Sequence, residues 1–469
     1  MERERKLSVE PGFVLPPLPV DAEPRDLRAI YYDTPGHRLT RHGVTLRRRS
    51  ENGREFWQLK LPADGDRLEL EWDAEGPEIP GELTWLLTAY LRGSELEPIA
   101  ELHTLRRAVR VSAKDHESAE VVHDSVQVLD GTRVVREFDE VEIEQTTDGS
   151  EQLVARLERA LRAAGAKSSD GRPKVFQALG LPAARSARPK RSAETIEHLR
   201  AYLQAQLEAL LRSDPMTRRG DGAALHGMRV ATRRTRSALK EARRLLDPAW
   251  VKETRDELKW LGGVLGDVRD SDVFAAYVES EVARLGGNAE EGGRDLVQLI
   301  GERSQPARAR LDETLDSHRY LALLDRLEAT RESLPVTPAR ETVRCIVRRA
   351  AQRVRCKLPT VSPSAGDKQL HELRIAAKRA RYAAELASGA EGRPARRVAK
   401  RATDLQTILG EHQDAVIAEQ HLQELAGDAT PAAAFVAGRL AERQRDRRAA
   451  ARAGLPAVAK RFASAAKRL

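Results

Sequence analysis

The feature that most constrains the fold of this 469-residue chain is an internal repeat in its second half. The segment HGMRVATRRTRSAL at residues 226–239 aligns with HELRIAAKRARYAA at residues 371–384, an offset of 145 residues. LGDVRDSD at 265–272 aligns with LGEHQDAV at 409–416, an offset of 144 residues. Two matched blocks at nearly constant separation indicate a duplicated unit. The surrounding Ala, Leu and Arg-rich sequence predicts two helical bundles, with interruptions at 286–293, 334–338, 358–367 and 389–394.

Each repeat carries a row of basic side chains on one side of a helix. At about 100° per residue, each row falls within an arc of roughly 80°. The first row consists of His226, Arg229, Arg233, Arg236 and Lys240, and the second consists of His371, Arg374, Lys378 and Arg381, with Glu385 where the first has its last lysine. At a rise of about 1.5 Å per residue, fourteen residues span roughly 21 Å, a length that suits a chain of several phosphates.

These basic rows differ from an ordinary solvated helix face. A solvated face normally mixes charge signs, because i,i+4 pairs of opposite sign stabilise a helix by a few tenths of a kcal/mol and like charges destabilise it by similar amounts. In both copies a histidine is followed by several basic side chains that repel one another. We therefore expect a bound anion to supply the missing negative charge. The histidines themselves show no metal-ligand spacing such as HxxxH, and each could be an ordinary bundle histidine.

The paired H-x-x-R-x-x-x-[RK]-R-x-R segments and the two LGxxxD segments resemble the CHAD domain, a conserved-histidine helical domain. The resemblance covers about residues 192–469, and we place the domain at 195–469, with halves at about 195–333 and 338–469. It implies two pseudo-symmetric bundles that bind inorganic polyphosphate through the basic rows. Asp270, Asp272 and Asp414 would then be structural partners of those basic side chains.

The sequence before residue 195 has a different organisation. A stretch rich in Pro, Ala, Arg and Ser at residues 181–194 predicts a linker. Before it, short alternating runs such as RLELEW and RVVREFDEVEIEQ, with a turn signal at Asp130-Gly131, predict an antiparallel sheet or barrel. Helices are expected at 82–92 and at 150–165, where Leu153, Leu157 and Leu161 have helical spacing. The N-terminal part is therefore expected to be α+β.

Charged side chains recur at every second position of these strands, beginning with MERERK at the N-terminus. Because alternate side chains of a strand share a face, Glu2, Glu4 and Lys6 lie together on one side. The same spacing recurs at Arg47 and Arg49, at Arg67, Glu69 and Glu71, and at Glu140, Glu142 and Glu144. Such a face either meets water or, in a closed barrel, lines an interior. In an interior, the carboxylates would bind a hard divalent cation and the basic side chains would hold phosphate oxygens.

This order of segments resembles the CYTH family, the triphosphate tunnel metalloenzymes that include thiamine triphosphatase and class IV adenylyl cyclase. The initial ExExK is followed by YYDT (31–34), LRRR (46–49), LKLP (59–62), RLELE (67–71), TLRR (104–107), VHD (122–124) and EVEIE (140–144). The resemblance covers about residues 1–180 and implies an antiparallel β tunnel barrel with flanking helices that uses Mg²⁺ or Mn²⁺. The whole chain is therefore expected to be α+β, this barrel being followed by an all-α domain.

Carried over residue by residue, the resemblance implies a role for each charged side chain. Metal would be bound by Glu2, Glu4, Asp124, Glu142 and Glu144, and triphosphate by Lys6, Arg47, Arg49, Lys60, Arg106 and Lys174, with Arg107 and Arg110 as further candidates. Glu69, Glu71 and Glu140 would support the basic groups. Glu4 and Lys6 would be catalytic, since Lys6 crowded by other cations would have a lowered pKa and could assist as a base. The family usually has Ser where this chain has Pro173.

The predicted function is metal-dependent hydrolysis of inorganic triphosphate or short polyphosphate by the N-terminal domain, with polyphosphate binding by the C-terminal domain. A tethered polymer-binding domain raises the local concentration of such substrates, which favours an inorganic triphosphatase over a thiamine triphosphatase. The alternatives are another CYTH activity, thiamine triphosphatase or class IV adenylyl cyclase, and a non-catalytic polyphosphate-granule protein. The carboxylates argue against the last alternative, since a pure polyanion binder gains nothing from them.

Composition restricts the partners and the location of the protein. Residues 191–469 hold 51 Lys and Arg against 38 Asp and Glu, whereas residues 1–190 hold 29 against 34, so a polyanion is expected to meet the second part. Nucleic acid ranks last because aromatic residues make up only 4%. Without an apolar run of roughly 18 residues, and with only Cys345 and Cys356, we expect a cytoplasmic protein with reduced thiols, at polyphosphate granules or free, and no membrane partner. The oligomeric state is left open.

Overall fold

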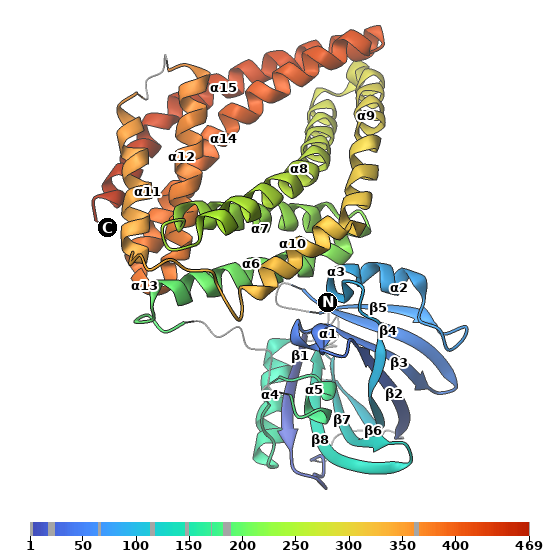
Figure 1. Ribbon diagram of the computed structural model, residues 1–469. Coiled ribbons are helices and arrows are strands. Elements are labelled where there is room, and N and C mark those ends of the chain that lie inside the picture. The colour runs from blue at the N-terminus through green and yellow to red at the C-terminus, as the bar shows by residue number, and fades with distance from the viewer. Residues whose placement is uncertain are drawn as a thin grey trace. The chain divides into compact units, whose positions relative to one another are not determined.

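The computed structural model describes residues 3–16, 24–63, 67–112, 118–145, 150–169, 171–181, 189–360 and 365–468. The chain divides into two compact units, Met1–Arg185 and Ser186–Leu469. Figure 1 shows strands and short helices in the first unit and long helices in the second. The predicted combination of an antiparallel sheet and an all-α part is confirmed.

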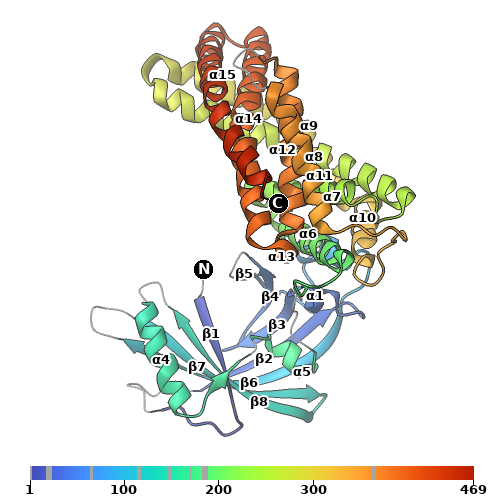
Figure 2. The same cartoon turned by 90° about the vertical axis from the view of Figure 1, so that its left-hand side faces the viewer.

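The first unit contains one nine-stranded antiparallel sheet. Its strands are β1 (Arg3–Val9), β2 (Arg25–Asp33), β3 (Thr45–Glu51), β4 (Arg54–Pro62), β5 (Arg67–Asp73), β6 (Glu97–Ser112), β7 (Ser118–Asp130), β8 (Arg133–Gln145) and β9 (Lys167–Ser168). They pair in the order β5-β4-β3-β2-β6-β7-β8-β1-β9. The sheet is strongly curved (Figure 2), but among the described residues no pairing joins β5 to β9, so the ladder stays open rather than closing into the expected barrel.

One face of the sheet is apolar where it packs on a helix. Helix α4 (Glu151–Ala163) starts after Ser150, whose hydroxyl accepts a hydrogen bond from the Leu153 amide at 3.2 Å, which satisfies one free N–H of the first turn. Leu153, Leu157 and Leu161, the residues whose spacing predicted this helix, pack against buried strand residues that include Leu7, Val121 and Val141. Burial of this apolar stripe holds β1, β7 and β8 against α4.

The opposite side of the sheet, here called the charged face, carries Lys6, Arg106, Asp124, Glu140 and Glu142. These residues share a face because Lys6 pairs opposite Glu142, while Asp124 pairs opposite both Glu140 and Arg106. Helix α5 (Lys174–Ala178) packs on the same face through Val175 and Phe176, which contact Ala29, Tyr31 and Leu102. Its first residue, Lys174, is thereby held over the charged strands.

Short helices complete the first unit. The expected helix at 82–92 is present as two pieces, α2 (Gly81–Leu86) and α3 (Thr88–Leu91), and α1 (Arg38–Arg41) follows β2. The carboxylate of Asp33, in the YYDT segment, is fully buried and accepts hydrogen bonds from the amides of Thr34, Leu39 and Thr40 at 2.7–2.9 Å. Asp33 therefore holds the turn that follows β2.

The second unit is built from helices, with an isolated β-bridge between Leu246 and Val336 among the residues described. Its helices are α6 (Thr195–Arg218), α7 (Gly222–Glu241), α8 (Pro248–Leu285), α9 (Glu290–Asp316), α10 (His318–Ala329), α11 (Val343–Lys357), α12 (Asp367–Leu386), α13 (Ser388–Glu391), α14 (Arg393–Asp428) and α15 (Pro431–Ala466). The repeat appears as matching pairs: α12 begins 145 residues after α7, and α14 begins 145 residues after α8. None of the described helices combines the length and the apolar character that spanning a bilayer requires.

Two long hairpins, α8 with α9 and α14 with α15, pack together where each hairpin turns (Figure 1). The interruption expected at 286–293 is shorter than its glycines suggested: a 3₁₀ turn covers Gly287–Ala289, and α9 already starts at Glu290. Gly292 and Gly293 therefore lie inside α9. An added Cβ on Gly292 would overlap the backbone of Ala432, so this glycine serves close packing and not a turn.

Candidate active site

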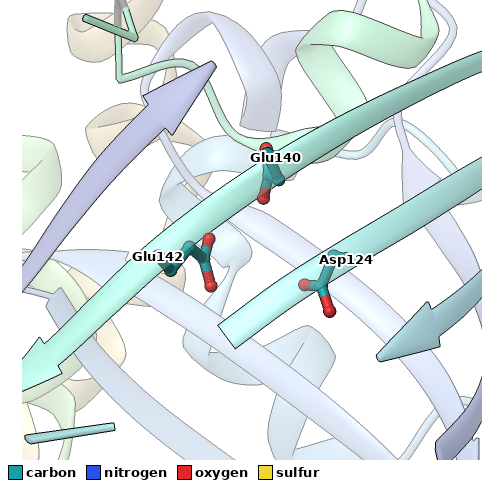
Figure 3. A group of neighbouring side chains, drawn as sticks. All are labelled: Asp124, Glu140 and Glu142. Atoms are coloured by element: carbon teal, nitrogen blue, oxygen red, sulfur yellow. The ribbon is translucent and has the colours of Figure 1, made fainter. Parts of the chain in front are cut away.

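Three carboxylates from two neighbouring strands converge on the charged face (Figure 3). Glu140 and Glu142 lie on β8, and Asp124 lies on β7 directly opposite Glu140. One oxygen of each carboxylate lies within 4.8 Å of the others, close enough to share a cation. Their residues are only 0%, 3% and 4% exposed for Asp124, Glu140 and Glu142. Buried carboxylate oxygens in this arrangement fit a hard divalent cation such as Mg²⁺ or Mn²⁺.

Three basic side chains meet this acidic cluster from β1, β6 and α5. Arg106 donates two hydrogen bonds to Asp124, from Nε at 2.9 Å and from Nη2 at 2.7 Å. The Nζ of Lys174 lies 2.9 Å from Asp124, 2.5 Å from Glu140 and 3.4 Å from Glu142. Lys6 pairs with Glu142 and lies 3.7 Å from Glu140. The formal charges of these six side chains therefore cancel.

Burial and ion pairing act on the pKa values of these groups in opposite directions. Burial raises the pKa of Glu140, although Lys174 and Lys6 oppose it. Burial also disfavours the charged form of Glu142, but Lys174 and Lys6 outweigh it and hold the pKa of Glu142 well below its ordinary value. Burial would lower the pKa of Lys174, but Glu140 and Glu142 outweigh it and raise that pKa well above its ordinary value. Glu142 and Lys174 are therefore ionised at neutral pH.

A second group of cations lies on β3 and β4. Arg47 donates a hydrogen bond from Nη1 to the phenol oxygen of Tyr31 at 2.9 Å and another from Nε to Gln58 Oε1 at 2.8 Å. The amide of Gln58 donates in turn to Glu71 at 2.8 Å and to Glu69 at 3.2 Å. Glu69 also pairs with Lys60. Glu69 therefore contacts a basic side chain directly, and Glu71 is connected to Arg47 through Gln58.

Cations of both groups act on the phenol of Tyr31. Burial would raise the pKa of the Tyr31 phenol, but Arg47, Lys174 and Lys60 outweigh it and lower that pKa. The strand pairings put Tyr31 and Arg47 on the charged face that also carries Arg106 and Asp124, and Lys174 lies over this face on α5. Burial and the neighbouring Arg47 also lower the pKa of Arg49 to about 10. These cations repel one another, as expected for a surface that binds an anion.

Several predicted residues lie apart from the acidic cluster. Glu2 is outside the described residues, and only the backbone of Glu4 is described, opposite Glu144 in the pairing of β1 with β8. Glu144 is not among the three clustered carboxylates, whereas Glu140, expected only to support, is one of them. Arg107 follows Arg106 in β6 and so points to the other face. Arg110 lies opposite Glu120, in the same register row as Glu4 and Glu144.

Two further expectations concern lysines. Pro173 precedes α5 and caps it without a side-chain hydrogen bond, yet Lys174 still reaches the acidic cluster, so the unusual proline does not displace it. Lys6 was expected to be crowded by cations. In the structure its Nζ lies against the carboxylates of Glu142 and Glu140, which the Nζ of Lys174 also contacts.

Sequence reasoning missed Tyr31 and Gln58. Tyr31 stood within the YYDT segment, and only the pairing of β2 with β3, which sets Tyr31 opposite Arg47, reveals its contact. Gln58 had a detectable signal, because it lies two residues before Lys60 on the same strand and so on the same face.

The basic rows of the second unit lie on α7 and α12. His226 and His371 are exposed, and Arg229, Arg233, Arg236, Lys240, Arg374, Lys378 and Arg381 are all half-buried. The Nε of Arg233 donates to the phenol oxygen of Tyr382 on α12 at 2.6 Å, which joins the two rows. Glu385, where the second row departs from the first, accepts from Arg381 at 2.8 Å and lies 3.1 Å from Arg234.

The last aspartate of each LGxxxD segment accepts a hydrogen bond from an arginine of the nearby basic row. Arg229 bonds to Asp270 at 2.6 Å, and the equivalent Arg374 bonds to Asp414 at 3.3 Å. Two of the three expected structural partners, Asp270 and Asp414, therefore bond to row arginines. Asp272 differs: it pairs with Arg308 of α9 and not with a row residue.

Three more arginines belong to this cationic surface. Burial lowers the pKa of His226, and Arg269 and Arg233 lower it further. Burial also lowers the pKa values of Arg236 and Lys240. Arg255 lowers that of Arg236 further, and Arg379 lowers that of Lys240 further. The Nε groups of Arg255 and Arg269 are buried and have no hydrogen-bond acceptor in the described structure. Arg255 and Arg269 join the cationic surface only because α8 packs against α7. The helical spacing of the α7 sequence alone could not reveal them.

Lys378 is the lysine most affected by its neighbours on this surface. Burial, Arg374 and Arg233 lower its pKa to about 8, and Asp414 only partly opposes them. The rows therefore form a surface with more positive charge than its own carboxylates compensate.

Comparisons with known proteins agree with this division of the chain. The CYTH domain matches residues 1–172 and the CHAD domain matches residues 201–423. Two Mycobacterium tuberculosis proteins, the uncharacterized proteins MT2285 (strain CDC 1551 / Oshkosh) and Rv2226 (strain ATCC 25618 / H37Rv), are each 32% identical over 490 residues, which cover 95% of this chain and 93% of theirs.

Solved structures are similar over part of the chain. The CHAD domain from the plant Ricinus communis is 28% identical with a TM-score of 0.49, covering 59% of this chain and 95% of that domain. PptA from Streptomyces chartreusis is 25% identical with a TM-score of 0.46, covering 58% and 99%. On the strength of the full-length relatives and the two matched domains, the chain belongs to the family of proteins in which a CYTH domain is followed by a CHAD domain.

Proposed function

We propose that the N-terminal unit is a divalent-metal-dependent inorganic triphosphatase, acting on triphosphate or short polyphosphate, and that the helical unit binds inorganic polyphosphate. CYTH domains are in general metalloenzymes that act on phosphoanhydrides, and CHAD domains are associated with polyphosphate. One observation carries the proposal: the charged face of one sheet bears a buried carboxylate cluster and two groups of cations. A metal-assisted phosphoanhydride hydrolase needs both parts.

The residues divide the work by their chemistry. Asp124, Glu140 and Glu142 would hold Mg²⁺ or Mn²⁺, with Glu2, Glu4 and Glu144 as further proposed ligands. When bound, such a cation neutralises phosphate oxygens and activates water. The phosphate oxygens would be bound by Lys6, Arg47, Arg49, Lys60, Arg106 and Lys174. Because the site is largely buried, these charges act at low dielectric and stabilise developing charge more strongly than they would in water.

The role of Lys6 in this proposal is to bind phosphate. A base would have to lose the ammonium proton of Lys6, whereas that ammonium group pairs with Glu142 and lies 3.7 Å from Glu140, two carboxylates that Lys174 also contacts. We therefore assign Lys6 no proton transfer. Glu4 is proposed to act through the metal.

We propose inorganic triphosphate as the substrate, rather than thiamine triphosphate or ATP, because the chain carries a second domain. A polyphosphate-binding unit on the same chain raises the local concentration of polymer and of its short products. The rows on α7 and α12, joined through Arg233 and Tyr382, provide the surface proposed for the polymer and for association with polyphosphate granules.

Phosphate release from four substrates tests the activity. Tripolyphosphate, ATP, thiamine triphosphate and long-chain polyphosphate would each be assayed with Mg²⁺, with Mn²⁺ and with a chelator. We expect metal-dependent release that is fastest from tripolyphosphate. Cyclic AMP formation from ATP would identify a cyclase instead, and polyphosphate binding without any phosphate release would leave a non-catalytic granule protein.

Binding by the helical unit is tested separately by competition. Labelled long-chain polyphosphate would be bound to the full chain at moderate salt and challenged with unlabelled polyphosphate or double-stranded DNA. We expect the polyphosphate to compete at much lower phosphate concentration, whereas equal competition by DNA would indicate a general polyanion surface.

A further inference from the structure

The acidic cluster and the proposed phosphate-binding cations are bonded to each other in the protein alone. Each carboxylate of the cluster has at least one basic partner: Asp124 has Arg106, Glu140 has Lys174, and Glu142 has Lys6. The side chains of Lys6 and Lys174 are each only 11% exposed, so solvent is a poor substitute for these partners. The groups proposed to hold metal are thus occupied by the groups proposed to hold phosphate.

A divalent cation that entered this cluster alone would meet balanced charges. To reach Glu142 and Glu140 it would have to displace the ammonium groups of Lys6 and Lys174. Those ammonium groups would then be left nearly buried beside an additional positive charge, which is strongly unfavourable. Metal binding without phosphate should therefore be weak.

Triphosphate that entered alone would meet the opposite difficulty. If its oxygens drew Lys6, Arg106 and Lys174 away, the carboxylates of Asp124, Glu140 and Glu142 would be left buried and unpaired. Leaving buried charges without partners is strongly destabilising and opposes the new phosphate contacts of these basic side chains. Only when a metal and a triphosphate enter together does each buried group gain a partner of opposite charge.

We propose that Lys6 and Lys174 act as internal counter-ions which block the metal site until triphosphate accepts them, so that metal and triphosphate bind with strong positive coupling. This inference rests on the proposed function for the location of both ligands. By linkage, the factor by which triphosphate tightens metal binding equals the factor by which metal tightens triphosphate binding. The lysines thereby limit metal binding to the moment when substrate is present.

The test measures Mn²⁺ binding to the full-length protein by electron paramagnetic resonance, without turnover. Wild type is compared with Lys6→Met and Lys174→Met, which keep an apolar stem of similar length but remove the ammonium group. In the absence of any phosphate, we expect each variant to bind Mn²⁺ at least tenfold more tightly than wild type. Lys167→Met is the matched control, since Lys167 pairs with Glu10 at an exposed position outside the site and its loss should leave Mn²⁺ affinity unchanged.

A second arm adds tripolyphosphate in which imido groups replace the bridging oxygens, and corrects for its own Mn²⁺ complex. We expect this analogue to tighten Mn²⁺ binding at least tenfold in wild type and several-fold less in Lys6→Met. Equal Mn²⁺ affinity in wild type and both lysine variants, with thermal melts showing that all are folded, would overturn the inference. Because no step requires phosphate release, absence of triphosphatase activity would defeat the proposed function while leaving this binding result readable.

Discussion

The guanidinium of Arg47 donates a 2.9 Å hydrogen bond to the phenol oxygen of Tyr31 and forms no ion pair with any carboxylate that the structure describes. Its other bond is to the neutral side chain of Gln58. Lys60 and Arg106, by contrast, each have a carboxylate partner. Arg47 is therefore the proposed phosphate ligand whose charge is least compensated within the protein, and a bound phosphate oxygen would gain the most from it.

Replacing Arg47 should accordingly weaken catalysis strongly. Hydrogen bonds to charged groups contribute about 1.5–3 kcal/mol, so Arg47→Gln should lower kcat/KM for tripolyphosphate roughly 10- to 100-fold. Arg48→Gln is the matched control, because Arg48 lies on the other face of β3 and pairs with Glu55. Initial rates of phosphate release measure both. Similar losses in the two variants would show that Arg47 does not face the substrate.

Glu142 contacts both lysines of the cluster. Glu142→Gln keeps the shape of the side chain but removes the charge that a divalent cation requires. We expect metal-dependent phosphate release to fall at least about 100-fold, since loss of even an outer partner of a metal ligand costs 10- to 100-fold. Glu137→Gln, an exposed change on the same strand, should retain activity. Mn²⁺ titrations of phosphate release would compare them, and normal activity in Glu142→Gln would exclude this site.

The strand residues show how far the sequence could predict the charged face. Alternation placed Glu140, Glu142 and Glu144 on one side of a strand, and the structure agrees. Which of them meet Asp124 depends on the register between β7 and β8, which a single sequence does not reveal. The contact of Lys174 depends further on how Val175 and Phe176 pack on the sheet, a tertiary relationship over more than 40 residues of chain.

The helical unit was more predictable, because a helix imposes its own periodicity. The rows on α7 and α12 follow from spacing alone, and in the structure Arg229 bonds to Asp270 as Arg374 does to Asp414. Arg255 could not be recognised, since its place beside Arg236 depends on the packing of α8 against α7.

Lys378 makes polyphosphate binding depend on pH. The groups that lower its pKa to about 8 include Arg374 on its own helix and Arg229 and Arg233 on α7, and Asp414 on α14 opposes them. A bound polyanion favours the ammonium form, so affinity is highest when Lys378 is already charged. As pH rises from 7 to 9 the free protein loses this proton, and affinity should fall about tenfold. Equilibrium binding of long-chain polyphosphate across this range measures the effect.

The control for this pH dependence is Lys378→Arg, which keeps its charge throughout the range. We expect its binding curve to be nearly flat between pH 7 and 9. His226 does not confuse the comparison, because burial and Arg269 lower its pKa further below neutrality. An unchanged pH dependence in Lys378→Arg would assign the titration to another group.

The glycine pair of α9 gives a test of the helical packing itself. Glycine in a sequence usually signals a turn, so the interruption was expected to run through residue 293, but Gly292 is buried inside α9 and its Cα faces the backbone at Ala432 near the start of α15. Gly292→Ala should force these helices apart and lower the free energy of unfolding by about 1–3 kcal/mol. Gly301→Ala, an exposed position in the same helix where an added Cβ meets nothing within 4 Å, should instead stabilise by up to about 1 kcal/mol. Denaturant unfolding of the two variants measures this difference, and a neutral or stabilising Gly292→Ala would show that α9 and α15 do not pack this closely.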